Sequence, residues 1–133
     1  MKDNYFLDTN VLIYTVTGEE RKKEIAINLL CTNAVISTQV VNECINVMSR
    51  KWKYDYSQIR LVTAQFTQEC QVMTLSLRTV SLAMNLAEKY RYTYFDSLIL
   101  ASALEANCES LYSEDLQHGQ VIDQRLRIIN PFL

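Results

Sequence analysis

The sequence predicts an α/β fold with a mainly parallel, five-stranded sheet in a single domain of residues 1–133. Short apolar runs alternate with stretches of helical periodicity, and strands separated by helices are typical of a parallel sheet covered on both faces. The length of 133 residues and the hydrophobic fraction of 49% suit one domain with a sizeable core. With only two glycines and one proline, the elements should be regular and closely joined.

The first half of the chain contains two strand-like runs and three helical stretches. They are a strand at 5–8, a helical run at 11–16, a helix at 20–30, a strand at 34–37 and a helix at 39–51. The helix at 20–30 is predicted because Ile25 and Leu29 lie four residues apart on one side. The second strand ends at Ser37 and Thr38, which are polar residues typical of a helix start.

The second half repeats this alternation. It contains a helix at 56–69, a strand at 71–75, helices at 79–90 and 94–106, and strands at 110–113 and 127–129. Ser57 lies at the start of the first of these helices, and Asn130 and Pro131 close the last strand. The whole order is therefore β-α-β-α-α-β-α-α-β-β.

Four acidic residues stand where an acid has little structural reason to be. They are Asp8, Glu43, Asp96 and Asp115. A buried carboxylate is costly unless it is paired or bound to a metal, and no basic residue stands beside any of the four. In open parallel sheets ligands collect outside the carboxyl ends of the strands, where Asp8 and Asp115 are expected. Together the four acids predict an oxygen-ligand site for a hard divalent cation.

Each acid also has a structural explanation of its own. Asp8 suits a helix N-cap, and Asp96 in a first helical turn interacts favourably with the helix dipole. Glu43 could reach around its helix to water, and Asp115 lies in a predicted turn. Only their joint placement predicts a site.

The net charge of −2 at first argues against a nucleic-acid partner. If metal neutralises the four acids, the 13 basic residues face 11 remaining acids and the rest of the surface is slightly positive. Basic residues gather at 21–23 and again at Arg50, Lys51 and Lys53, with the aromatic Trp52 among them. Basic side chains hold phosphates and aromatic faces stack on unpaired bases, so this second cluster is a candidate substrate contact. The alternative is a solvated helix end with Trp52 in the core or in a subunit contact.

The four cysteines form no C-x-x-C pair and the chain has one histidine, which argues against structural zinc. Four reduced, mostly buried thiols suit a cytoplasmic protein. No apolar run approaches the roughly 18 residues of a membrane span, and we expect neither a signal peptide nor a membrane partner.

Four segments around the acids look like motifs of one family. They are Phe6-Leu7-Asp8-Thr9-Asn10-Val11-Leu12-Ile13-Tyr14, Ser37-Thr38-Gln39-Val40-Val41-Asn42-Glu43, Tyr94-Phe95-Asp96-Ser97-Leu98-Ile99-Leu100-Ala101-Ser102-Ala103 and Leu111-Tyr112-Ser113-Glu114-Asp115-Leu116-Gln117-His118-Gly119. The chain thereby resembles the PIN-domain family of metal-dependent ribonucleases. The ending Ile128-Ile129-Asn130-Pro131-Phe132 is similar to that of VapC-like toxins.

The resemblance implies a three-layer α/β/α sandwich and an Mg²⁺ or Mn²⁺ ion. Asp8 and Asp96 would be direct ligands, with Asp115 and Glu43 completing the pocket directly or through water. Ser113 matches a position that often carries a hydroxyl near the metal, and Asn10 is a further candidate contact. The resemblance also implies an RNA substrate, a homodimer and a small antitoxin that inserts into the groove.

Phosphodiester hydrolysis needs an activated water and relief of charge on the phosphate, and a bound divalent cation supplies both. We expect Glu43 to orient or deprotonate the water. Without metal, crowded carboxylates should repel one another, so some should have a raised pKa. His118 is the one rival general base, and a turn residue is the simpler interpretation of it.

Three other functions are alternatives to a metal-dependent ribonuclease. A haloacid dehalogenase-like phosphatase would want a second aspartate two residues after Asp8, but that position is Asn10. A receiver domain would want a second N-terminal acid beside Asp8 and a lysine at the fifth strand, and neither is evident. The serious alternative is a non-catalytic PIN-like module that binds RNA or protein, although no acid of the set is lost.

Overall fold

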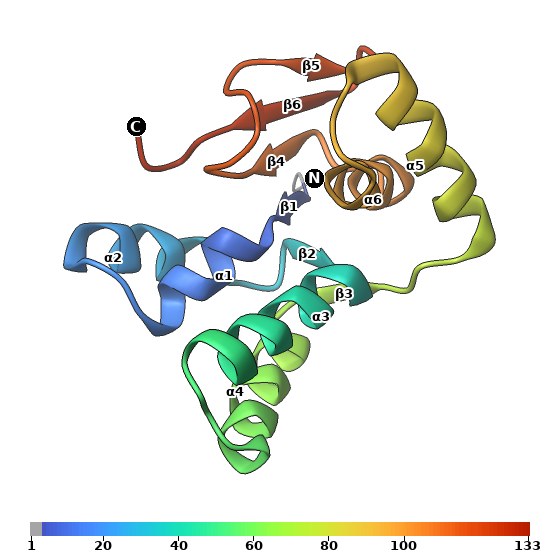
Figure 1. The fold of residues 1–133 in the computed structure, drawn as a ribbon. Helices are drawn as coiled ribbons and strands as arrows, with labels where there is room; N and C mark the ends of the chain where they lie inside the picture. The colour runs from blue at the N-terminus through green and yellow to red at the C-terminus, as the bar shows by residue number, and fades with distance from the viewer. Residues whose placement is uncertain (1–3) are drawn as a thin grey trace.

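The computed structural model of the protein describes residues 4–133 and places a six-stranded sheet at the centre of the fold (Figure 1). The strands lie in the order β3-β2-β1-β4-β6-β5, and β5 alone runs antiparallel to its neighbour. They are β1 (Tyr5–Leu7), β2 (Ala34–Ser37), β3 (Gln71–Met73), β4 (Ser110–Tyr112), β5 (Val121–Ile122) and β6 (Leu126–Ile129). The predicted α/β class with a mainly parallel sheet is confirmed.

Helices cover the sheet in a three-layer α/β/α arrangement. They are α1 (Thr9–Val16), α2 (Glu20–Leu29), α3 (Thr38–Asn46), the π-helix η1 (Val47–Lys51), α4 (Tyr56–Glu69), α5 (Leu77–Tyr90) and α6 (Tyr94–Glu105). None of the helices in residues 4–133 is long and apolar enough to cross a bilayer.

The predicted number of five strands is wrong, because the structure has a sixth, β5. This strand has two residues, which is too short for an alternating pattern to be recognised in the sequence. It pairs with β6 across a turn in which Asp123 and Gln124 both have positive φ. The predicted domain of residues 1–133 includes residues 1–3, which lie outside the described part of the chain.

Two helical predictions also change. The expected run at 11–16 and the expected helix at 20–30 are the separate helices α1 and α2, with Gly18 between them, so the predicted order counted one helix too few. Helix α5 begins at Leu77 rather than at residue 79, because Ser76 caps it by accepting a hydrogen bond from the N–H of Thr79.

Helix α6 lies between the sheet and α5, packed against both β2 and β4 (Figure 1). Every residue from Ser97 to Leu104 is buried, which explains why this helix is apolar on all sides. Because its body is enclosed, its first turn is held in a fixed place, and that turn carries Asp96.

Strand β1 is the topological switch point of the sheet. The chain leaves β1 for β2 on one side, and β4 later pairs with its other side. Phe6 and Leu7 are fully buried, so the strand has no solvent-facing side. In open α/β sheets the carboxyl end of such a strand opens onto the ligand crevice, and here that end is occupied by Asp8.

Gly18 allows the sharp change of direction between α1 and α2. Its φ is +124°, and a Cβ atom there would lie 2.7 Å from the ring of Tyr14. That ring cannot move away freely, because the Tyr14 hydroxyl donates a 2.6 Å hydrogen bond to Glu114.

We therefore expect Gly18→Ala to lower the free energy of unfolding by about 1–3 kcal/mol, from backbone strain and the clash together. Gly119→Ala is the matched control, because Gly119 has a φ of +88° but nothing within 4 Å of the added Cβ. Urea unfolding of both variants measures the difference. Equal losses in the two variants would show that the Tyr14 contact contributes nothing.

Candidate active site

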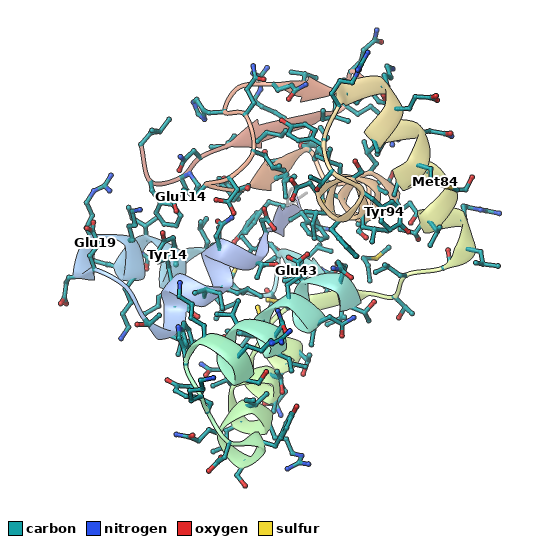
Figure 2. The ribbon with its side chains drawn as sticks, in the orientation of Figure 1. Tyr14, Glu19, Glu43, Met84, Tyr94 and Glu114 are labelled. Carbon is teal, nitrogen blue, oxygen red and sulfur yellow. The ribbon has the colours of Figure 1, made fainter. Side chains whose placement is uncertain are left out.

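The four predicted acids line one groove. The groove has a volume of about 810 Å³ and lies between α1, α3 with η1, the start of α6 and the loop after β4. Figure 2 shows Glu43 on α3, Tyr14 on α1 and Glu114 on the β4 loop, which are three of the segments that surround it. The fold thus brings together residues that are up to 107 positions apart in the sequence.

Asp8 is the innermost acid, with only 6% of its surface exposed. It caps α1 by accepting a 2.7 Å hydrogen bond from the N–H of Thr9, and its other oxygen accepts one of 2.7 Å from the hydroxyl of Ser113. Burial raises the pKa of Asp8 to about 7, and the charges of Glu43 and Asp115 add to this, while its two hydrogen bonds oppose it. Asp8 is therefore the N-cap of α1 and at the same time lines the groove.

Glu43 points its carboxylate into the groove from the second turn of α3. One oxygen accepts a 2.5 Å hydrogen bond from the Thr9 hydroxyl, and the other accepts a 2.9 Å hydrogen bond from the Gln39 amide. Thr9 therefore connects Asp8 and Glu43, through its N–H to one and its hydroxyl to the other. Neither Thr9 nor Gln39 was predicted to belong to the site. The i, i+4 spacing of Gln39 and Glu43 was the available signal.

Asp96 lies in the first turn of α6, but Thr93 caps that helix instead. The Thr93 hydroxyl accepts a 3.1 Å hydrogen bond from the N–H of Asp96, so the Asp96 carboxylate is not needed for capping and lines the groove. Burial raises the pKa of Asp96, and the charges of Glu43 and Asp115 raise it further. Asp96, Glu43 and Asp115 are therefore close enough for their charges to interact.

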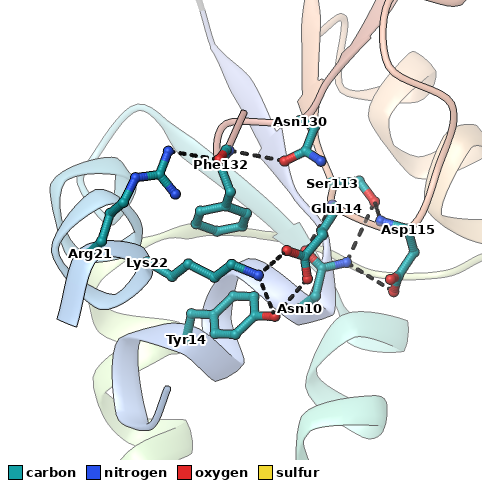
Figure 3. Close-up of polar contacts among 9 residues, drawn as sticks. All are labelled: Asn10, Tyr14, Arg21, Lys22, Ser113, Glu114, Asp115, Asn130 and Phe132. Atoms are coloured by element: carbon teal, nitrogen blue, oxygen red, sulfur yellow. Dashed lines mark hydrogen bonds and ion pairs between the residues drawn. The ribbon is translucent and has the colours of Figure 1, made fainter. Parts of the chain in front are cut away.

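Asp115 follows β4 and is held by Asn10. The Asn10 side-chain amide donates to Asp115 at 3.1 Å (Figure 3). It also donates to Asp8 at 3.4 Å, while its carbonyl oxygen accepts from the N–H of Glu114. The Ser113 hydroxyl also accepts from the N–H of Asp115. Ser113 is fully buried beneath the groove, so its contacts orient the acids.

The predicted basic and aromatic cluster divides into two parts. Lys51 and Trp52 line the groove, whereas Arg50 and Lys53 are exposed and are not among its lining residues. In a regular α-helix Trp52, nine residues after Glu43, would lie on the opposite side of the helix. The wider turn of η1, closed by the N–H of Trp52 donating to the carbonyl of Val47, changes this rotation.

In the other basic cluster, at residues 21–23, Arg21 and Lys22 form contacts within the protein. Lys22 forms an ion pair with Glu114 and lies over the rings of Tyr14 and Phe132. Arg21 donates a 2.7 Å hydrogen bond to the carbonyl of Phe132, as Figure 3 shows. This network joins α1, α2 and the C-terminal segment at the edge of the groove and fixes the loop that carries Asp115.

His118 lies outside the groove. It is exposed, and its Nδ1 accepts a 2.9 Å hydrogen bond from the N–H of Asn130. It thus stabilises the turn after Asp115, which agrees with the simpler interpretation of this residue.

The donor atoms around the groove suit a hard divalent cation. Five carboxylates, three hydroxyls and four side-chain amides among the described lining residues offer oxygen atoms, and Lys51 is the cationic side chain in this set. Within residues 4–133, however, no three Asp, Glu, His or Cys side chains converge tightly enough to enclose an ion. Such a spread set fits Mg²⁺, which keeps several waters and is usually bound through one or two carboxylates rather than a protein cage.

Comparison with known proteins agrees with this geometry. Residues 5–122 match the family model described as the PIN domain, so the resemblance seen in the motifs is confirmed. No curated protein gives a significant match to the sequence. The fold is similar to a toxin–antitoxin complex from Klebsiella pneumoniae, with a TM-score of 0.73, 20% identity, and 96% of this chain and 98% of that chain covered.

Two further solved structures have similar folds. One is VapC20 of Mycobacterium tuberculosis, described as a toxin that cleaves the sarcin–ricin loop, with a TM-score of 0.67, 14% identity, and 84% of this chain and 92% of that chain covered. The other is VapBC2 from Rickettsia felis bound to a promoter DNA fragment, with a TM-score of 0.68, 18% identity, and 95% and 98% covered. At these identities the likeness concerns the fold.

The raised pKa of Asp8 predicts how the metal-free protein responds to pH. The folded state holds this proton up to about pH 7, whereas the unfolded state releases it near pH 3.8. Stability should therefore fall as pH rises from about 4 to 7, by on the order of 4 kcal/mol for the full difference. Asp8→Asn removes this loss, so the variant should exceed the native protein in stability at pH 8 and match it more closely at pH 4.

Urea unfolding in chelator at both pH values measures this effect. Asp115→Asn is the control, because Asp115 is exposed and its substitution should change the pH dependence much less. A native protein that is equally stable at pH 4 and pH 8, with no gain in Asp8→Asn, would contradict the assignment.

Proposed function

Because this chain belongs to the PIN domain family, we propose that it is a divalent-metal-dependent ribonuclease and the toxin of a toxin–antitoxin pair. The observation that carries the proposal is the convergence of Asp8, Glu43, Asp96 and Asp115 on one groove from four separate segments. Burial raises the pKa of Asp8 and Asp96, and the neighbouring acids Glu43 and Asp115 raise it further, so a bound cation would relieve the cost of ionising them.

The residues divide into distinct roles. Asp8, Asp96 and Asp115 would hold Mg²⁺ or Mn²⁺, which when bound lowers the pKa of water and neutralises charge on the phosphate. Glu43 is placed to accept the proton of the attacking water, because Thr9 and Gln39 fix its carboxylate. Water adds to phosphorus, the bond to one bridging oxygen breaks, and that oxygen leaves as a hydroxyl after gaining a proton. Asn10 keeps Asp115 close to Asp8 throughout.

RNA is the proposed substrate and a small antitoxin the proposed partner. One structure of similar fold is described as a toxin–antitoxin complex, and another as a toxin that cleaves the sarcin–ricin loop. Lys51 and Trp52 in the groove wall supply a phosphate contact and a stacking face for such a substrate. We place the protein in the cytoplasm, where buried thiols such as Cys44, Cys70 and Cys108 stay reduced.

The test is cleavage of total cellular RNA by the purified protein with Mg²⁺, with Mn²⁺ and with chelator. We expect metal-dependent cleavage that falls by at least about a hundredfold in Asp96→Asn, because one ligand charge is lost. Asp55→Asn is the control, since Asp55 is an exposed helix cap outside the groove and asparagine caps equally well.

The same experiment addresses the alternative of a non-catalytic RNA- or protein-binding module. A folded protein that cuts no RNA under any condition and binds no Mn²⁺ by calorimetry would favour that module. Binding of Mn²⁺ without cleavage would mean that the metal site exists but that the required RNA was absent.

We also propose a homodimer formed through α4. Tyr56 and Leu61 are exposed on this helix, and their burial against a second copy would remove apolar surface from water. Light scattering at micromolar concentration should give twice the chain mass of 15.4 kDa. Leu61→Asp should reduce this mass to that of one chain, whereas Ile27→Asp on α2, the control, should not. A native protein that is monomeric would exclude the dimer.

A further inference from the structure

Phe95 is an aromatic residue in the groove wall with no part in the network of the acids. It stands directly before Asp96 in the first turn of α6, and 58% of its surface is exposed. The contrast with the rest of α6 is sharp, because residues 97–104 are all buried. A phenyl ring has no hydrogen-bonding group, so an exposed one beside an acidic site is available for contact with another apolar or aromatic face.

The ring is also held in place. Tyr94 meets it edge-on, with the two ring centroids 5.6 Å apart, and Figure 2 shows Tyr94 at the start of α6. The enclosed body of α6 fixes the backbone beneath both residues. A ligand that contacts Phe95 therefore meets a surface that is already ordered, which reduces the entropy lost on binding.

We propose that Phe95 stacks on an unpaired base beside the phosphate that is cut, an inference that rests on the proposed ribonuclease function. Phe95 and Asp96 are consecutive residues on the same groove wall, so a base on the ring has its phosphate near the carboxylates. Stacking of a base on an aromatic ring tolerates any base, because every base has a π-face. Phe95 thus selects for an unpaired nucleotide rather than for a particular sequence.

Trp52 is a second aromatic residue of the groove wall. It follows the π-helix η1, whereas Phe95 belongs to α6. Asn42 and Asn46 also line the groove, and their amides can bond to base edges or sugars. The groove therefore offers aromatic faces from two separate segments together with polar groups.

This arrangement fits a single strand better than a duplex. The bases of a double helix are already stacked on one another, and their faces cannot reach a protein ring without being displaced. A protein partner could also cover Phe95, since Ile13 and Val47 line the same groove, but Lys51 and the nearby amides suit the phosphates and bases of RNA. RNA binding is therefore the occupant that the surrounding residues favour.

The experiment uses eight-nucleotide single-stranded RNAs, each with one 2-aminopurine at a different position, and the full-length protein with Ca²⁺ in place of Mg²⁺. Stacking quenches the fluorescence of 2-aminopurine, so one position should be quenched by the native protein more than its neighbours. Phe95→Ala should abolish that quenching and weaken binding by about 5- to 150-fold. Phe95→Tyr should retain both properties, and Phe95→Leu should lose the quenching because it has no π-face.

Leu77→Ala is the matched control, because Leu77 is an apolar side chain with 86% exposure that lies outside the groove. It should bind each RNA as the native protein does. Binding and quenching that are unchanged in Phe95→Ala would overturn the proposal and leave the ring for a protein partner. A native protein that binds none of the RNAs would also overturn it.

Cleavage of unlabelled RNA in Mg²⁺, measured in parallel, separates the two proposals. If the native protein binds with Phe95-dependent quenching but cuts nothing, stacking stands and the ribonuclease function fails. If it cuts RNA and Phe95→Ala cuts with the same kcat/KM, the ribonuclease function stands and stacking fails. Stacking beside the cut phosphate requires kcat/KM to fall with the loss of binding.

Discussion

The buried carboxylate of Asp8 is the interaction on which the site depends. It lies at the carboxyl end of the central strand β1, where it caps α1. It also accepts a hydrogen bond from the hydroxyl of Ser113, the residue that follows β4. The hydrogen bonds of Thr9 and Ser113 offset part of the cost of burying this charge, yet the pKa still reaches about 7. The other site residues are arranged around this acid, since Thr9 extends to Glu43 and Asn10 extends to Asp115.

The groove combines fixed acids with walls of different character. Its acids are held by a chain of short polar contacts that crosses from α1 to α3 and to the β4 loop. Its rim on the α1 side is stabilised by the ion pair of Lys22 with Glu114. Glu114 also accepts a hydrogen bond from the Tyr14 hydroxyl (Figure 3). A metal ion in such a groove would meet preordered oxygen atoms, and an RNA strand would meet aromatic side chains on either side.

Two unusual backbone conformations lie close to the groove. The π-helix η1 interrupts the helix that carries Glu43 before Lys51 and Trp52 reach the groove wall. Gly18 takes up a positive φ against the ring of Tyr14, at the turn that follows α1. Strained or unusual backbone is often found at functional sites, where the surrounding packing supports it. Here the enclosed helix α6 and the central strands supply that packing.

The sequence by itself determined the α/β class, the order of the longer elements and the four acids, because these depend on periodicity and on residues out of place in an apolar context. The two-residue strand β5 was missed, since it is too short to leave a periodic pattern. Only the tertiary structure decided which neighbours support the acids. Thr9 and Asn10 act through contacts between segments far apart in the chain, and Gln39 through a contact within α3. It likewise separated Lys51 and Trp52 from Arg50 and Lys53, and it exposed Phe95 beside Asp96, because the direction of a side chain is fixed by helix geometry and packing.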